Sequence, residues 1–468
     1  MKKSEFIALI TEKFKHLPTK GQKKAIALFT DYMCCRENGA VMLLKGYAGT
    51  GKTSLVSAFV QALKELKITT LLLAPTGRAA KVLGNYSSQQ AYTIHKEIYS
   101  IKADKDGNER LLMRKNEHQN TIFFVDEASM IYDVQPVQNA MVLFQDTNLL
   151  YNLFSYVEQG QNCRLIFIGD TAQLPPVGLP YSPALDVDFL RDNFSKLIFD
   201  CELKEVVRQL KNSGVLYNAT KIRALLGKQS DIEYQFVLNN FDDIETVSAN
   251  DLLEKLEWAY QKYDVENVVV VTRTNKQANI LNQTVRNRIL YRDTELERGD
   301  SVINLKNNYF WLSKNTETKF IANGDMMEIV RVFNTEERYG FHFADVKVRL
   351  PDYEMDDIEV KLILDALYVE GAAMTSDNRN QLYHEVCRDY EHIHARKKRF
   401  AEIKKDPYLN ALQVKFAYAQ TCHKTQGGQW DIVFVYQGYV TKNTISDDYY
   451  RWLYTAVTRT KKQLFLIV

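Results

Sequence analysis

Residues 46–53 read GYAGTGKT, and this octapeptide decides the fold of the first part of the chain. It follows an apolar run at 41–44 and precedes a segment, 54–66, whose apolar residues recur at helical spacing. A strand, a glycine-rich loop and a helix in this order fit the Walker A pattern, whose backbone N–H groups cradle phosphates. The stretch therefore predicts a nucleotide site with Mg²⁺, in which Lys52 reaches the β and γ oxygens and Thr53 holds the metal.

Three more apolar runs, at 70–74, 121–125 and 164–168, each end in a polar cluster. Ligands of open α/β sheets bind at the carboxyl ends of strands, so these clusters should share one edge of a sheet. After the second run, Asp126 would help to hold Mg²⁺ and Glu127 would act as general base towards the attacking water. We therefore expect residues 1–200 to form one ATP-binding α/β domain.

A second α/β domain follows from the later strand-like runs at 268–272, 432–436 and 464–468. Between these runs, 299–350 is rich in strand-like segments and turns, which indicates a small β-barrel. Residues 356–409 read as helical and charged. The chain is thus expected to hold a second domain at 201–298 and 411–468, interrupted by a barrel and helical insertion at 299–410.

A basic cluster lies within that insertion, where residues 391–405 contain six Lys or Arg and two Glu. Such a run is more often a solvated helix face than a phosphate contact, and both interpretations stay open at this point.

Bulk properties limit the class of protein only broadly. The 468 residues carry 60 basic and 58 acidic side chains, so any grip on a polyanion must come from a local groove. No apolar run is long enough to span a bilayer, and the six cysteines form no CxxC pair. Reduced thiols without a membrane segment favour a cytoplasmic protein.

The order of the polar motifs resembles that of superfamily 1 helicases, in the branch of RecD-like and Dda-like proteins. TKGQ at 19–22 is similar to the family's Q-type motif, and the remaining motifs follow in order: APTGRAAK at 74–81 (motif Ia), TIH at 93–95 (Ib), DEASM at 126–130 (II), GDTAQLPPV at 169–177 (III), VVRQ at 206–209 (IV), YAQTCHKTQG at 418–427 (V) and YTAVTR at 454–459 (VI).

The resemblance implies two RecA-like P-loop domains that hydrolyse ATP between them, with an SH3-like β-barrel inserted into the second. It implies a γ-phosphate sensor in Gln173 and arginine fingers in Arg208 and Arg459, beside the catalytic Lys52, Asp126 and Glu127. The nucleotide contacts that we expect are Gln22, which would read adenine, together with Gly46, Ala48, Gly49, Thr50, Gly51, Lys52, Thr53, Ser54 and Gly427.

Single-stranded DNA and its junctions with duplex are the partners that the resemblance implies for a monomer moving 5′ to 3′. The expected DNA contacts are Pro75, Thr76, Arg78, Thr93, His95, Thr272, Asn275, Thr421, His423 and Lys424. Small polar residues suit a grip that ignores base sequence. Threonine and asparagine also cap helices, so a purely local role stays open for each of them.

A hairpin inserted at about 96–120 would separate the strands, because Asp106-Gly107 is a good hairpin turn between two short runs. Its second arm offers no aromatic ring, so Leu111, Leu112 or Met113 would have to form the pin. A plain surface hairpin is the alternative.

Three functions remain to be separated. A DNA helicase accounts for every motif and for the hairpin. A translocase that strips proteins from DNA, or that moves on RNA, uses the same motifs. A DNA-binding subunit that does not hydrolyse ATP conflicts with the intact catalytic set.

Overall fold

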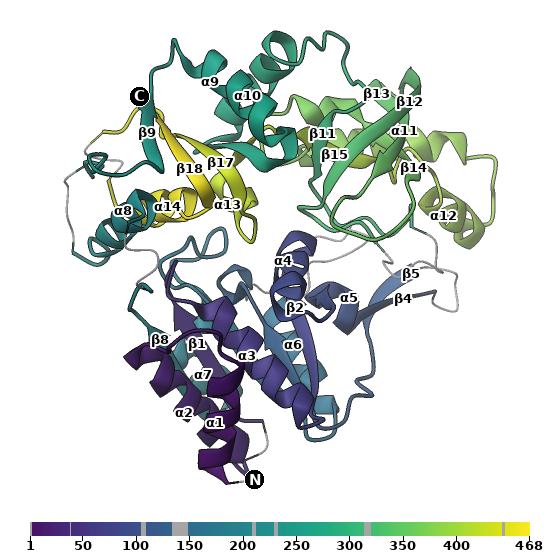
Figure 1. The fold of residues 1–468 in the computed structure, drawn as a ribbon. Helices are drawn as coiled ribbons and strands as arrows, with labels where there is room; N and C mark the ends of the chain where they lie inside the picture. The colour runs from purple at the N-terminus through teal and green to yellow at the C-terminus, as the bar shows by residue number, and fades with distance from the viewer. Residues whose placement is uncertain are drawn as a thin grey trace.

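The computed structural model describes residues 2–37, 39–103, 109–132, 148–207, 212–228, 233–312, 320–441 and 445–468. Two α/β domains face each other, and a β-barrel with two helices stands beside the second one (Figure 1). The fold class expected from the sequence is confirmed.

A six-stranded parallel sheet forms the N-terminal domain, in the order β3-β2-β6-β7-β1-β8. Its strands are β1 (Val41–Gly46), β2 (Thr69–Ala74), β3 (Ala91–Thr93), β6 (Thr121–Val125), β7 (Arg164–Gly169) and β8 (Ile198–Leu203). Helices α1 (Lys3–Lys13), α2 (Lys20–Cys34) and α3 (Lys52–Glu65) cover one face, and α5 (Ile94–Ile98), α6 (Leu149–Gln159) and α7 (Val187–Phe194) the other. Val41 and Leu43 face one helical layer, while Met42 and Leu44 face the other. Burial on both sides explains why the strand reads as a continuous apolar run.

The second domain repeats this plan with five parallel strands in the order β16-β10-β17-β18-β9. These are β9 (Ile244–Val247), β10 (Val268–Thr272), β16 (Ala419–Thr421), β17 (Trp430–Tyr436) and β18 (Thr460–Ile467). Its helices are α8 (Gly214–Arg223), α9 (Leu252–Tyr263), α10 (Asn275–Arg288), α13 (Cys422–Thr425) and α14 (Asp447–Val457). The strands predicted at 268–272 and 432–436 are present and central.

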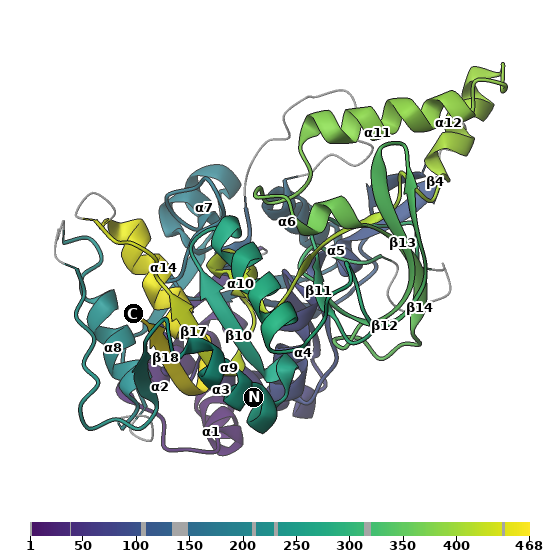
Figure 2. The same ribbon diagram turned by 90° about the horizontal axis from the view of Figure 1, so that it is seen from above.

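The insertion is a closed five-stranded barrel that carries a helical arm. The barrel strands are β11 (Ser301–Asn304), β12 (Met326–Arg338), β13 (Phe341–Arg349), β14 (Ile358–Ile363) and β15 (Leu412–Phe416). Helices α11 (Ser376–Asp389) and α12 (Arg396–Lys404) extend beyond the barrel (Figure 2). We call these two helices the arm. No helix in the described ranges has the length and apolar character that crossing a bilayer requires.

The structure corrects two expected domain limits and one expected secondary-structure assignment. A domain limit at 200/201 would cut β8, which pairs with β1 in the first sheet. A second-domain segment starting at 411 would include β15, which pairs with β11 and β14 in the barrel. Residues 358–363 were expected to be helical but form β14, because Val360 and Leu362 alternate into the barrel core.

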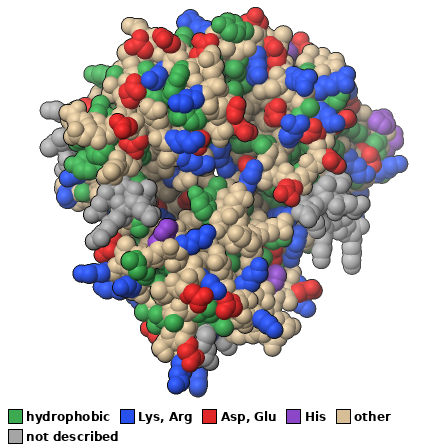
Figure 3. All heavy atoms as spheres, in the orientation of Figure 1, with side chains coloured by type: hydrophobic (Ala, Val, Ile, Leu, Met, Phe, Trp, Pro, Cys, Tyr) green, Lys and Arg blue, Asp and Glu red, His purple; other side chains and the backbone are tan. Residues whose placement is uncertain are grey.

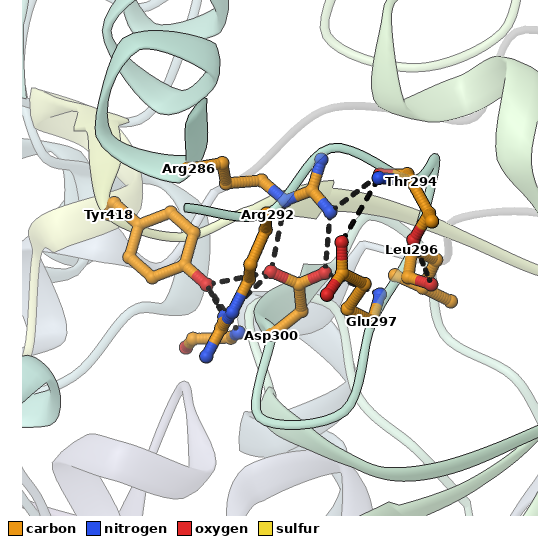
Figure 4. Close-up of polar contacts among 8 residues, drawn as sticks. Arg286, Arg292, Thr294, Leu296, Glu297, Asp300 and Tyr418 are labelled. Carbon is orange, nitrogen blue, oxygen red and sulfur yellow. Dashed lines mark hydrogen bonds and ion pairs between the residues drawn. The ribbon is translucent and has the colours of Figure 1, made fainter. Parts of the chain in front are cut away.

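A buried ion cluster joins the barrel to the second domain (Figure 4). Asp300, just before β11, accepts two hydrogen bonds from Arg286 of α10, at 3.0 and 2.9 Å. Arg292 donates to the same carboxylate at 2.8 Å and to the Tyr418 hydroxyl at 2.6 Å. Since Asp300 and Arg286 are almost fully buried, the cluster fixes the barrel to α10.

Asp300→Ala is expected to destabilise this joint strongly, because it leaves the Arg286 guanidinium buried without its carboxylate. Breaking a buried ion pair on one side costs about 3–5 kcal/mol. In thermal unfolding, the melting temperature of Asp300→Ala should lie clearly below that of the wild type. Asp357→Ala is the matched control, because it removes only the ion pair with half-exposed Arg349. Equal melting temperatures for both variants would contradict a structural role of the cluster.

Candidate functional site: the ATP cleft and the DNA channel

The loop between β1 and α3 ends at the start of a helix, whose first backbone N–H groups have no partner within the helix. Gly51 precedes α3 with φ of 80°, and no side chain caps the helix. The first N–H groups of α3 are therefore available to an anion, which the helix dipole also favours. The Lys52 ammonium donates to the carbonyl oxygen of Tyr47 at 3.1 Å and to that of Gly46, so it lies inside the loop.

Packing explains two of the predicted loop residues. A Cβ atom on Gly46 would lie 2.9 Å from the Leu203 side chain and 3.0 Å from that of Lys52. Thr50 is buried, and its hydroxyl donates to the carbonyl of Tyr47 at 2.7 Å. Gly46 and Thr50 thus shape the loop rather than line the cavity.

Gln22 is buried behind the same loop. Its amide nitrogen donates to the Thr50 carbonyl at 3.0 Å, and its side-chain oxygen accepts from the Thr19 backbone at 2.8 Å. The residue lines the nucleotide cavity while it completes the cap of α2. An adenine contact would have to share or replace these bonds.

The acidic pair after β6 lies at the edge of the same cavity. Burial, helped by the neighbouring Glu127, raises the pKa of Asp126 to about 7. A divalent cation held by Asp126 and Thr53 would offset this cost and neutralise phosphate charge, and oxygen donors of this kind suit Mg²⁺. Glu127 adopts φ of 50°, a left-handed conformation that turns the chain away from the sheet.

Gln173 carries a buried polar atom that the described residues leave unpaired. Its side-chain oxygen has no hydrogen-bond partner there, although the side chain lines the cavity. An unpaired buried amide oxygen is costly, and because it can only accept a hydrogen bond, a donor such as a water beside a terminal phosphate would recover that energy. The phosphate oxygens themselves could bond only to the NH₂ group of the same amide.

Residues of the second domain close the other side of the cleft. The Tyr454 hydroxyl of α14 accepts from the Ala48 backbone of the phosphate loop at 2.8 Å and donates to Asp170 at 2.6 Å. Leu174 is held in the same way, since its N–H donates to Thr455 at 2.9 Å and its carbonyl accepts from Gln426 at 2.7 Å. The two domains are thus hydrogen-bonded directly through the catalytic motifs.

Arg459 lies in this cleft but bonds within its own domain. Its guanidinium donates to the carbonyls of Thr455 at 3.0 Å and Gly428 at 3.3 Å. Only 4% of the residue is exposed, and it still lines the cavity of 1710 Å³. Arg208, the other expected finger, lies outside the described residues.

Most of the expected nucleotide contacts meet in this one cavity. The lining includes Gln22, Ala48, Gly49, Gly51, Lys52, Thr53, Ser54, Asp126, Glu127, Gln173 and Arg459. Gly427 was expected to contact the nucleotide, and this expectation is wrong. A Cβ atom at this position would lie 2.9 Å from Ala79 in α4 (Gly77–Ser87). It therefore permits close packing of the two domains and does not line the nucleotide cavity.

A second, larger cavity of 2070 Å³ runs between the N-terminal domain, the second domain, the barrel and the arm. We call it the channel. Figure 3 shows the surface hollowed between the two lobes, with Lys and Arg side chains near the hollow. Eight of the ten expected DNA contacts line the channel: Pro75, Thr76, Arg78, His95, Asn275, Thr421, His423 and Lys424.

Thr93 and Thr272 are corrections to that set. Thr93 is 5% exposed and caps α5 by accepting from the Lys96 backbone at 3.2 Å. Thr272 is fully buried, and its hydroxyl donates to the Thr274 carbonyl at 3.1 Å. Neither lines the channel, so the local role left open for such residues applies to them.

Burial changes the charge of two residues in the channel. It lowers the pKa of His95 to about 4, so His95 is neutral at neutral pH. Burial and nearby Lys415 lower the pKa of Lys424 to about 7, and its ammonium has no hydrogen-bond partner among the described residues. A phosphate beside Lys424 would favour the charged form.

Sequence reasoning missed residues that no helicase motif contains. The barrel and arm contribute Lys306, Tyr309, Arg379, Tyr383, Arg396 and Phe400 to the channel. The sequence also did not show that Arg78 bridges the two domains. Its guanidinium lies 3.8 Å from the centre of the Trp430 ring and donates to the Gln429 carbonyl at 3.1 Å. The basic run within residues 391–405, for which a phosphate contact was left open, was the one signal that pointed to the arm.

The predicted hairpin is present as β4 (Tyr99–Ala103) and β5 (Glu109–Met113). Its expected Asp-Gly turn lies outside the described residues, and nothing is described of the Leu111 side chain. Leu112 is 44% exposed, whereas Met113 packs against the core of the N-terminal domain. Of these two, only Leu112 is free to meet a base pair.

This fold and this site define an ATPase with two RecA-like domains and a P-loop. The chain matches the AAA domain family over residues 19–227 and the UvrD-like helicase C-terminal domain over residues 416–467. It is 24% identical to the ATP-dependent DNA helicase dda of Enterobacteria phage T4, over 96% of this chain and 99% of that one.

An uncharacterized protein of Methanocaldococcus jannaschii is also 24% identical over 95% of this chain, which spans 38% of that relative's length. Among solved structures, the Pif1 helicase from Bacteroides in complex with ADP-AlF3 and single-stranded DNA aligns over 97% of this chain and 92% of its own. The identity there is 14% and the TM-score 0.47. The two family matches and the phage relative support a superfamily 1 helicase of the RecD and Dda type.

Tyr454→Phe is expected to lower the DNA-stimulated kcat about tenfold while nucleotide still binds. The change removes the bond between the domains and leaves the buried Asp170 carboxylate short of a donor, a loss of roughly 1.5–3 kcal/mol. Steady-state ATPase assays with nucleotide titration would measure it. Tyr449→Phe is the matched control, because its hydroxyl bonds to Gln437 within the second domain. Equal kcat in both variants would argue against coupling through Tyr454.

Proposed function

We propose that the chain is an ATP-dependent DNA helicase that moves along single-stranded DNA in the 5′ to 3′ direction. ATP binding in the cleft draws the two RecA-like domains together and hydrolysis releases them, while the channel grips the strand beside them. The cofactor is Mg²⁺, held by Thr53 and Asp126, and the working unit is a monomer.

One observation carries this proposal: both domains supply the wall of the ATP cavity and the wall of the channel. Lys52 and Glu127 come from the first domain and Arg459 from the second. Thr76 of the first domain and His423 of the second both line the channel in the same way. A change in the cleft therefore changes the spacing of the two grips on DNA, which is what a stepping motor needs.

The chemistry follows from positioning. Phosphoryl transfer spreads negative charge over the equatorial oxygens, and cationic groups stabilise that charge. Lys52 must leave the carbonyls of Gly46 and Tyr47 to reach a phosphate, and Arg459 must leave Thr455 and Gly428. ATP thus recruits side chains from both domains, and its hydrolysis releases them.

The relatives support DNA as the track. The phage T4 protein, which this chain matches over nearly its whole length, is described as an ATP-dependent DNA helicase. The direction of movement rests on the resemblance to the RecD-like and Dda-like branch.

Strand displacement on tailed duplexes tests the proposal directly. With ATP and Mg²⁺, the protein should open a duplex that carries a 5′ single-stranded tail and leave a 3′-tailed duplex intact. Lys52→Ala should abolish opening. If single-stranded DNA stimulated ATP hydrolysis while neither duplex opened, the protein would be a translocase that does not unwind.

Leu112 is the side chain that we propose to separate the strands. Leu112→Ala should slow strand displacement severalfold and leave DNA-stimulated ATP hydrolysis unchanged, because the residue is exposed and outside both cavities. Met113→Ala should instead lower thermal stability, since it removes contacts with the domain core. Unwinding that survives Leu112→Ala intact would remove this residue from the mechanism.

A further inference from the structure

The arm repeats one arrangement of side chains on both of its helices. On α11, Arg379 and Tyr383 are four residues apart, and on α12, Arg396 and Phe400 are four residues apart. Residues at this spacing share one face of a helix. All four side chains line the channel, so each helix turns a basic and an aromatic group towards the same space.

We propose that the arm is a binding subsite for single-stranded DNA, in which Tyr383 and Phe400 stack on unpaired bases and Arg379 and Arg396 hold the adjoining phosphates. The inference rests on the proposed function, because it names a further contact of the same strand. It adds residues that lie outside every helicase motif.

The charges of α12 support an anionic ligand. Its first four residues are Arg396, Lys397, Lys398 and Arg399, and its first turn has neither an acidic residue nor a side-chain cap. Positive charge at a helix N-terminus opposes the helix dipole, so these residues lower the stability of the helix. No acidic side chain in the described ranges forms an ion pair with Arg396, Lys398 or Arg399. A phosphate backbone would supply the missing negative charge.

The remaining contacts leave these groups accessible. The Arg379 guanidinium bonds only weakly to its own helix start, at 3.4 Å from the Thr375 carbonyl and 3.3 Å from the Ser376 hydroxyl. Phe400 is 36% exposed and has the Lys404 ammonium 4.7 Å from the centre of its ring, so a base would stack on the face that Lys404 does not cover. An exposed ring beside a guanidinium suits a base and its phosphate.

Aromatic rings favour single strands over duplex. Stacking on a protein ring needs the face of a base, which stacking on the neighbouring base pairs hides within a duplex. The arm also borders the channel that Pro75, Thr76 and His95 line from the N-terminal domain, so one strand can touch both walls. A duplex contact would require phosphates alone.

The double variant Arg396→Ala/Phe400→Ala tests the subsite. Fluorescence anisotropy with labelled oligo(dT), without nucleotide, should show binding weakened by about 5- to 150-fold, the range for loss of one stacked base. The negative slope of log affinity against log salt concentration should become shallower by about 0.7, because one phosphate contact is lost. Thermal unfolding checks that the variant is folded.

Arg331→Ala/Phe333→Ala is the matched control. This pair lies on β12, where the guanidinium is 5.1 Å from the exposed ring, and it does not line the channel. It should bind oligo(dT) as the wild type does. Equal affinity in both double variants would overturn the subsite while leaving the motor intact. Wild-type protein that failed to bind oligo(dT) at all would overturn the proposed function itself.

Photo-crosslinking gives a second measurement that does not depend on folding of a variant. An oligonucleotide with 5-iododeoxyuridine should attach to peptides containing Tyr383 or Phe400 in the wild-type protein. Adducts confined to the motif-bearing walls would contradict the proposal. So would a loss of affinity in Arg396→Ala/Phe400→Ala that affected a blunt duplex and spared oligo(dT), because the arm would then bind duplex DNA.

Discussion

The hydroxyl group of Tyr454 joins the catalytic parts of the N-terminal domain to the second domain. It lies between the backbone of the phosphate loop and the Asp170 carboxylate, although it belongs to the opposite domain. Burial holds the pKa of Tyr454 well above its usual range, so the hydroxyl keeps the proton that it donates. Because both sheets are parallel and turn polar edges towards this cleft, the catalytic residues and the DNA contacts depend on the same meeting of the domains.

Much of the motor could be predicted from the sequence because its chemistry dictates local patterns. A phosphate loop needs glycines at fixed positions, and a doubly covered strand such as 41–44 must be apolar on both faces. The resemblance to known helicases then fixed the order of the motifs, and eight of the ten expected DNA contacts line one channel.

The wrong predictions have physical causes that lie in the immediate surroundings of each residue. Thr93 and Thr272 carry the right chemical group, but their hydroxyls are used in capping and turn bonds that short motifs do not reveal. Gly427 was expected at the nucleotide from the resemblance alone, whereas here it allows two domains to approach. β14 was hidden in a charged stretch, because a barrel strand needs only alternate apolar residues. The arm could not be placed, since helical spacing alone does not say what a helix faces.

The buried cluster around Asp300 has a mechanical consequence. The barrel leaves the second domain after α10 and returns at β15, which is followed almost at once by β16 of the motor sheet. With Arg286, Arg292 and Tyr418 clamping one carboxylate at that junction, the barrel has little freedom to swing by itself. Barrel and arm should behave as a stiff lever on the second domain. A small rotation in the cleft would then become a longer stroke at the tip of the arm, in proportion to its distance from the joint.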